Sequence, residues 1–233
     1  MTTQSYARTA GLLYLIIAVF GAFSIGYVPS IIIEAGDAAT TANNLLANEA
    51  LFNMGIFGDI VVLLVEVVLT AMLYVMFKPV NHTLSLIAAW SRLAMVLVMA
   101  INLMFNIMPI LLLSDAEYLS AFEIMQLQSA ALVFFNAHAL GIYVWQLFFT
   151  VHLIALGALI IKSDLLPRVL GWMIIVGSFG YFIQAMAKLM HIQIDAIAMI
   201  YVGLLVVVTI GELSIAFWLL IKGVKISAEK DMS

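Results

Sequence analysis

Four ionisable side chains interrupt long hydrophobic segments of this sequence: Glu66, Arg92, His152 and Glu212. Each lies ten to twelve residues from the polar residue at one end of its segment. If the segments are membrane-spanning helices, all four side chains lie about 15–18 Å deep, near the bilayer centre. Ionisable groups at that depth are energetically costly and usually functional. We therefore predict that the four converge on one intramembrane site that binds a ligand or protons.

The segment from 51 to 77 shows why such a site needs several helices. Asp59 and Glu66 lie seven residues apart and share one helix face. Inserting two acids costs about 5–7 kcal/mol, and the neighbouring Leu, Ile, Val and Phe residues return about 4–8 kcal/mol, so the helix alone barely inserts. The helix therefore requires partners that satisfy its carboxylates.

A second polar layer is predicted nearer the opposite ends of the segments. Its members are Asp59, Asn102, Asn106, Gln146, Gln184 and Lys188, with His138 on the same helix face as His152. Together the two layers predict a polar column that opens outward and closes near the cytoplasmic half.

Several kinds of chemistry fit these residue types. An acid–base pair around His152 could move protons in catalysis or in coupled transport, because an unperturbed imidazole titrates near neutrality. A metal site would require Glu66, His152 and Glu212 to converge. A purely structural role would instead pair Glu66 with Arg92 and Asp59 with Lys188, which leaves one acid without a cation.

The composition defines the class of protein. Hydrophobic residues make up 66% of 233, charged residues only 9%, and the mean hydropathy is +1.19. Soluble domains carry about 25% charged residues, so these values predict an all-α polytopic membrane protein. The absence of cysteine excludes disulfides, thiolate nucleophiles and cysteine-ligated metals. The sequence does not identify a cofactor, and the partners we expect are the lipid bilayer and a small-molecule or lipid ligand, with no nucleic acid.

The hydrophobic pattern predicts one domain with six transmembrane helices and an outer amphipathic, interfacial helix. The amphipathic helix is expected at about 116–137, with Glu117 in its capping box. Asp37 is expected to cap a further short helix. The predicted spans are 10–33, 51–77, 84–113, 138–161, 169–190 and 197–221.

The distribution of Lys and Arg predicts the orientation. With the N-terminus inside, eight of these residues fall on or toward the cytoplasmic side, and only Lys188 falls outside. The eight are Arg8, Lys78, Arg92, Lys162, Arg168, Lys222, Lys225 and Lys230. We expect a multi-pass protein of the bacterial inner membrane with both termini cytoplasmic.

Several short motifs between Ala10 and Gly223 resemble those of the bacterial membrane family called domain of unknown function 4386. They include Asp59-to-Glu66 with Arg92, Tyr74-x-x-x-Lys78-Pro79-Val80-Asn81-x-Thr83-Leu84, Phe148-Phe149-x-x-His152, Leu166-Pro167-Arg168-x-Leu170-Gly171, Gly211-Glu212-Leu213 and Trp218-Leu219-Leu220-x-Lys222-Gly223. The resemblance implies a shared fold and topology, and it carries no activity to this chain.

Three functional hypotheses follow from the residues. The first is a protein that binds a small or lipid-like ligand in an outward-facing polar cavity, with proton-coupled transport as one form of this activity. The second is an intramembrane enzyme that uses Glu66, His152 and Glu212 on a lipid-soluble substrate. The third is a structural or regulatory membrane protein without a ligand.

Overall fold

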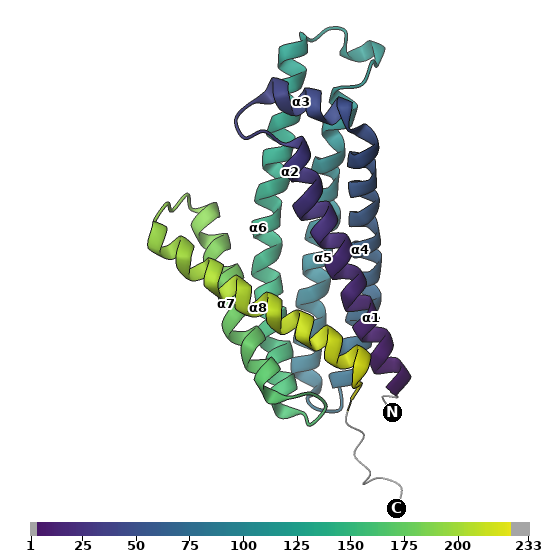
Figure 1. Cartoon of the computed structure of the whole chain (residues 1–233), viewed down its shortest axis with the longest axis vertical. Helices are drawn as coiled ribbons and strands as arrows, with labels where there is room; N and C mark the ends of the chain where they lie inside the picture. The colour runs from purple at the N-terminus through teal and green to yellow at the C-terminus, as the bar shows by residue number, and fades with distance from the viewer. Residues whose placement is uncertain (1–3, 225–233) are drawn as a thin grey trace, which may run out of the picture.

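The computed structural model describes residues 4–224, and these residues form an all-α bundle (Figure 1). Six of the described helices are long and apolar enough to cross a membrane, which confirms the predicted class and number of spans. The first span, Gln4–Ile32, contains α1 (Gln4–Gly21) and α2 (Val28–Ile32). The others are α4 (Glu49–Phe77), α5 (His82–Leu112), α6 (Ile124–Lys162), α7 (Arg168–Leu189) and α8 (Asp195–Ile221).

The first span changes its helical geometry without breaking. Residues Ala22–Tyr27 form a π-helix between α1 and α2, and the Val28 N–H accordingly donates to the Phe23 carbonyl five residues back. Pro29, which has no N–H to donate, lies in the first turn of α2 directly after the π segment. Within this π segment, Ser24 is buried in the interior of the bundle.

The short helix α3 (Ala38–Ala47) lies across the end of the bundle away from the chain termini (Figure 1). As predicted, Asp37 is its N-cap, because its side chain accepts a hydrogen bond from the Thr40 N–H. Thr41 and Leu45 are buried against the bundle. This helix is therefore a short additional helix that accompanies the six spans at the end of the bundle away from the termini.

The predicted outer helix at 116–137 is wrong in its boundaries. Only Glu117–Leu119 forms a short 3₁₀ turn there. The next helix begins at Ile124, where Glu123 and Gln126 form a reciprocal capping box, and it continues without interruption to Lys162. The expected cap around Glu117 is thus replaced by one six residues later, and 124–137 extends the fourth span beyond the other helices (Figure 1).

Glycines set the close packing of the second half of the bundle. A Cβ added to Gly177 of α7 would lie 2.5 Å from the Val208 backbone nitrogen of α8. A Cβ on Gly11 of α1 would lie equally close to the Leu220 nitrogen of α8. Small residues allow membrane helices to approach this closely, and van der Waals contact then supplies most of the association energy. The contact at Gly11 fixes where the first and last spans meet.

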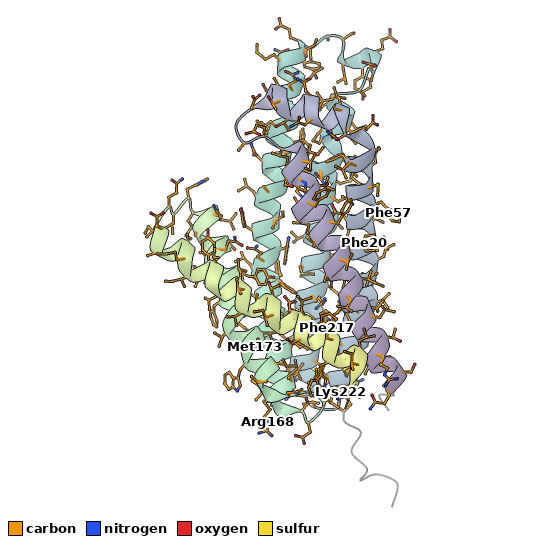
Figure 2. All side chains as sticks on the ribbon, viewed as in Figure 1. Phe20, Phe57, Arg168, Met173, Phe217 and Lys222 are labelled. Carbon is orange, nitrogen blue, oxygen red and sulfur yellow. The ribbon has the colours of Figure 1, made fainter. Side chains whose placement is uncertain are left out.

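Large apolar side chains cover the outer faces of the spans, as a bilayer requires. Phe57 is 61% exposed and Trp90 is 68% exposed. Figure 2 shows Phe57 and Phe217 on the outside of the bundle, while Arg168 and Lys222 lie near the end that carries the termini. Lys225 and Lys230, which also entered the orientation prediction, lie outside the described residues.

Candidate functional site

Arg92 is the centre of the candidate site. It lies on α5 and is 1% exposed, yet its guanidinium has three polar partners. Its Nε donates to Glu66 of α4 at 2.5 Å, and its Nη1 contacts His152 Nε2 of α6 at 2.8 Å. The same Nη1 donates to the Tyr14 hydroxyl of α1 at 3.4 Å. Four spans therefore contribute to one charged cluster, as a buried ion pair needs if its desolvation is to be offset.

Aromatic rings enclose the guanidinium. Its central carbon lies 5.2 Å from the Tyr14 ring centre and 5.8 Å from that of Phe149. A desolvated guanidinium over aromatic faces gains cation–π stabilisation of about 2 kcal/mol. Phe149 also stacks on His152 with ring centres 5.7 Å apart, so the rings hold both Arg92 and its imidazole partner in place.

The hydrogen bonds of His152 define its role. Its Nδ1 lies 2.8 Å from the Ala88 carbonyl, which can only accept, so Nδ1 carries a proton and donates. Its Nε2 faces an Arg92 N–H and therefore accepts. Both ring nitrogens are thus engaged by the protein, and His152 positions Arg92 from behind.

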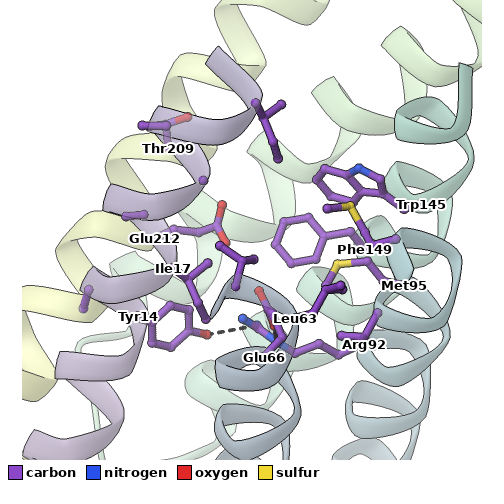
Figure 3. A pocket seen from close by; sticks show the side chains of 18 of the residues that line it. Tyr14, Ile17, Leu63, Glu66, Arg92, Met95, Trp145, Phe149, Thr209 and Glu212 are labelled. Carbon is purple, nitrogen blue, oxygen red and sulfur yellow. Dashed lines mark hydrogen bonds and ion pairs between the residues drawn. The ribbon is translucent and has the colours of Figure 1, made fainter. Parts of the chain in front are cut away.

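Glu212 lies on α8 beside the cluster, and it differs from Glu66 in its lack of an ion-pair partner. Neither of the ion pairs among the described residues, Arg92–Glu66 and Arg168–Asp164, involves this carboxylate. In Figure 3, Glu212 projects into the same space as Arg92 and Glu66. With one guanidinium and two carboxylates, the three groups have a formal net charge of −1.

A cavity of about 370 Å³ adjoins this cluster (Figure 3). All six spans contribute to its wall, which is mostly apolar. Its polar lining residues include Glu66, Arg92 and Glu212, whereas His152 is not among the lining residues. The remaining lining side chains are Tyr14, Ile17, Ala18, Gly21, Ala22, Ile25, Val62, Leu63, Met95, Val96, Met99, Trp145, Phe149, Tyr181, Thr209, Leu213 and Ala216.

The alternative of a metal site at Glu66, His152 and Glu212 finds no support in the geometry. Among residues 4–224, no three His, Asp or Glu side chains come together in a way that could hold a metal ion. Between Glu66 and His152 stands the Arg92 guanidinium, which binds both of them. A cation already occupies the place that a metal would need.

The second polar layer is not one column, because its members fall into separate places. Gln146 of α6 donates to Gln184 of α7 at 2.9 Å, away from α4. Lys188 is exposed, so the predicted ion pair between Asp59 and Lys188 is wrong. The neighbours of Asp59 are instead Ser24, Asn106 and His138.

His138 and Asn102 join α6 to α5 beside Asp59. The Asn102 amide donates to the His138 carbonyl at 2.9 Å, and His138 Nδ1 donates to the Asn102 carbonyl at 3.1 Å. His138 therefore belongs to the Asp59 neighbourhood and has no part in the Arg92 cluster, although it shares a helix with His152.

Sequence reasoning missed the aromatic residues of the site. Four aromatic residues line the cavity: Tyr14, Trp145, Phe149 and Tyr181. The Trp145 ring contacts the Phe149 ring edge to face and the Tyr181 ring at a tilted angle. Phe149 lies three residues before His152 and so near the predicted depth of the charged residues, whereas Tyr14 lies near the beginning of the predicted first span and carried no such signal. Hydrophobic segments contain many aromatics, so depth alone did not distinguish these from lipid-facing ones.

Fold and composition together define a polytopic helical membrane protein with a buried charged cluster. The chain belongs to the family described as domain of unknown function (DUF4386), whose sequence model matches residues 9–223. An uncharacterized protein of Archaeoglobus fulgidus is 27% identical over 172 residues, which cover 74% of this chain and 85% of that protein. No solved structure matches the chain.

Proposed function

We propose that this protein binds a small amphiphilic molecule with a cationic head group in the cavity beside Glu212. The observation that carries the proposal is an apolar cavity of about 370 Å³ with a charged end of formal net charge −1. Its volume falls within the range of roughly 300–1,000 Å³ typical of small-molecule sites. An apolar wall suits a hydrocarbon chain, and the charged end suits its head group.

The ionic state of the cluster favours an amine over an acid. The charge of Arg92 is already compensated by Glu66, and its Nε and Nη1 are bound to Glu66, His152 and Tyr14, so an anionic ligand would find no unpaired cation in the cluster. Glu212 forms no ion pair among the described residues. An ammonium group placed against Glu212 would neutralise the cluster, and neutrality is strongly favoured in a medium of low dielectric constant.

The rim of the cavity supports entry from the lipid phase. Ala22 of the π segment and Thr209 and Leu213 of α8 line the cavity and are also exposed. The first and last spans meet at Gly11 and diverge toward the other end of the bundle (Figure 1). The entrance therefore lies between these two spans, whereas the sequence predicts an outward-facing opening.

His152 supplies an argument against the enzymatic alternative. An acid–base residue must reach the substrate, yet His152 lies behind Arg92 and uses both ring nitrogens on protein groups. The structural alternative remains the competing hypothesis, and the following experiment separates it from ligand binding.

Binding can be tested with dodecylamine, dodecanol and dodecanoate as probes of identical chain length. We expect the purified protein in lipid nanodiscs to bind the amine most tightly and the carboxylate least. Glu212→Gln should remove the preference for the amine. Ala18→Phe, which fills the cavity, should abolish binding of all three probes, whereas Ala71→Phe on the exposed face of α4 should leave it unchanged. Equal binding to the two Phe variants would contradict the proposal.

We also infer the orientation in the membrane from the ends of the bundle. Lys78, Lys162, Arg168 and Lys222 lie at the helix ends near the chain termini, and Lys188 lies at the other end. The positive-inside rule then supports cytoplasmic termini in the bacterial inner membrane.

A further inference from the structure

We propose that the cavity selects quaternary ammonium groups over primary amines. This inference rests on the proposed function and specifies the head group that the cavity takes. The observation that carries it is a wall of three aromatic rings, Trp145, Phe149 and Tyr181, which lines the same cavity as the Glu212 carboxylate. Figure 3 shows Trp145 and Phe149 projecting from α6 toward the space that Glu212 enters from α8.

The three rings of this aromatic wall hold one another in place. The ring centre of Phe149 lies 5.4 Å from that of Trp145 and 5.3 Å from that of Tyr181, and the Trp145 and Tyr181 centres lie 6.0 Å apart. Aromatic pairs in edge-to-face contact at such distances are mutually stabilising. The wall is therefore formed before a ligand enters, which reduces the entropy lost on binding.

The aromatic wall already lies against one cation of the protein. The Phe149 ring centre is 5.8 Å from the central carbon of the Arg92 guanidinium, which Tyr14 contacts from α1. Glu212 lies within electrostatic range of both Tyr14 and Tyr181. A ligand cation beside Glu212 therefore meets aromatic rings as well as a carboxylate, and aromatic rings are the surroundings in which proteins recognise quaternary ammonium groups.

The hydrogen-bonding capacity of the cavity also favours a quaternary group. A primary ammonium group has three N–H donors, and each loses a water acceptor when the group enters the cavity. Glu66 and the Tyr14 hydroxyl already accept hydrogen bonds from Arg92. Glu212 is therefore the main acceptor on a wall that is otherwise mostly apolar. A quaternary ammonium group has no N–H to satisfy, so this wall suits it better.

The charge of the cluster distinguishes two sources of a quaternary ammonium group. Arg92, Glu66 and Glu212 together have a formal net charge of −1, which a single ammonium cation neutralises. The phosphocholine head group of a lipid carries a phosphate as well, so it would leave the net charge at −1 inside the membrane. We therefore assign the ligand as a cationic amphiphile rather than a zwitterionic lipid.

Three probes with the same hydrocarbon chain test the assignment: dodecyltrimethylammonium, dodecylamine and dodecylphosphocholine. Their binding is measured to the protein in nanodiscs of digalactosyl diacylglycerol, a neutral lipid without an ammonium group, and binding to empty nanodiscs is subtracted. We expect dodecyltrimethylammonium to bind about tenfold more tightly than dodecylamine. Dodecylphosphocholine should bind more weakly than dodecyltrimethylammonium.

Four variants test the role of the aromatic wall. Trp145→Leu and Tyr181→Leu should each reduce the preference for dodecyltrimethylammonium over dodecylamine to about threefold or less, whereas Trp145→Phe, which keeps a ring, should retain most of it. Trp90→Leu is the matched control, because Trp90 is 68% exposed on the outer face of α5, and it should leave the preference unchanged.

The outcomes separate this inference from the proposed function. Equal binding of dodecylamine and dodecyltrimethylammonium would overturn the inference and leave the proposed function standing, whereas failure of both to bind above empty nanodiscs would overturn both. An undiminished preference in Trp145→Leu and Tyr181→Leu would refute the role of the aromatic wall. Dodecylphosphocholine that binds as tightly as dodecyltrimethylammonium would refute the assignment to a cationic amphiphile.

Discussion

Replacing both members of the buried ion pair should cost much less stability than replacing one of them. In Glu66→Gln the Arg92 guanidinium, which is 1% exposed, loses the carboxylate 2.5 Å from its Nε. Leaving one partner of a buried pair uncompensated costs about 3–5 kcal/mol. Arg92→Met leaves the Glu66 carboxylate buried without a cation and should be at least as costly.

The double variant Glu66→Gln, Arg92→Met removes both charges together with the free energy needed to desolvate them. Apolar replacement of a buried pair is often neutral, and the Met thioether can contact the Tyr14 and Phe149 rings in place of the cation, so the main remaining loss is the Arg92 hydrogen bond to His152 Nε2. One unpaired acceptor costs about 1–3 kcal/mol. We therefore expect the double variant to unfold within about 3 kcal/mol of the parent and to be more stable than either single variant.

Reversible unfolding by titration of SDS into a mild detergent, followed by circular dichroism, would measure these differences. The exposed pair Arg168–Asp164, with 3.9 Å between its charged atoms, provides the matched control. Its single and double variants should each change the free energy of unfolding by no more than about 1 kcal/mol. A Glu66, Arg92 double variant that is less stable than both single variants would refute the reasoning, because the two losses would then add.

Three further predictions concern helix packing, topology and pH. Gly177→Ala should destabilise the protein by about 1–3 kcal/mol because the added methyl group meets the Val208 backbone, whereas Gly203→Ala, which meets nothing within 4 Å, should be neutral or stabilising; thermal unfolding of the two variants decides this. Single cysteines at Lys78 and Asp115, introduced into this cysteine-free chain, should react with an impermeant maleimide from opposite sides of the membrane, and reaction from the same side would contradict the bundle. Hydrogen bonds from Thr40 lower the pKa of Asp37 from its ordinary value of 3.8, so the cap on α3 should be fully effective above that value and lost as the pH falls through the lowered pKa. Hydrogen exchange of α3 amides in the parent should approach that in Asp37→Ala, which has no capping side chain, as the pH falls, and a difference that persists at low pH would contradict this assignment.

The sequence by itself determined the class of the protein and most of its helices. Long apolar segments leave no alternative to helices in a bilayer, because only a helix satisfies its own backbone hydrogen bonds. Asp37 marked the start of α3 because a capping side chain acts within three residues of its position. The depth of Glu66, Arg92, His152 and Glu212 could also be calculated, because rise per residue is constant in a helix.

The tertiary structure decided what these residues contact. Depth places side chains in one layer but does not fix the rotation of each helix, so Glu66 and His152 could have faced a metal and instead bind Arg92. Lys188 has the right depth to pair with Asp59, yet it is exposed at the end of α7. The cavity could not be predicted from any single segment either, because its wall combines all six spans. It lies where α8 diverges from α1 beyond their contact at Gly11. Helix rotation and tilt depend on packing between segments far apart in the chain, and no local pattern encodes them.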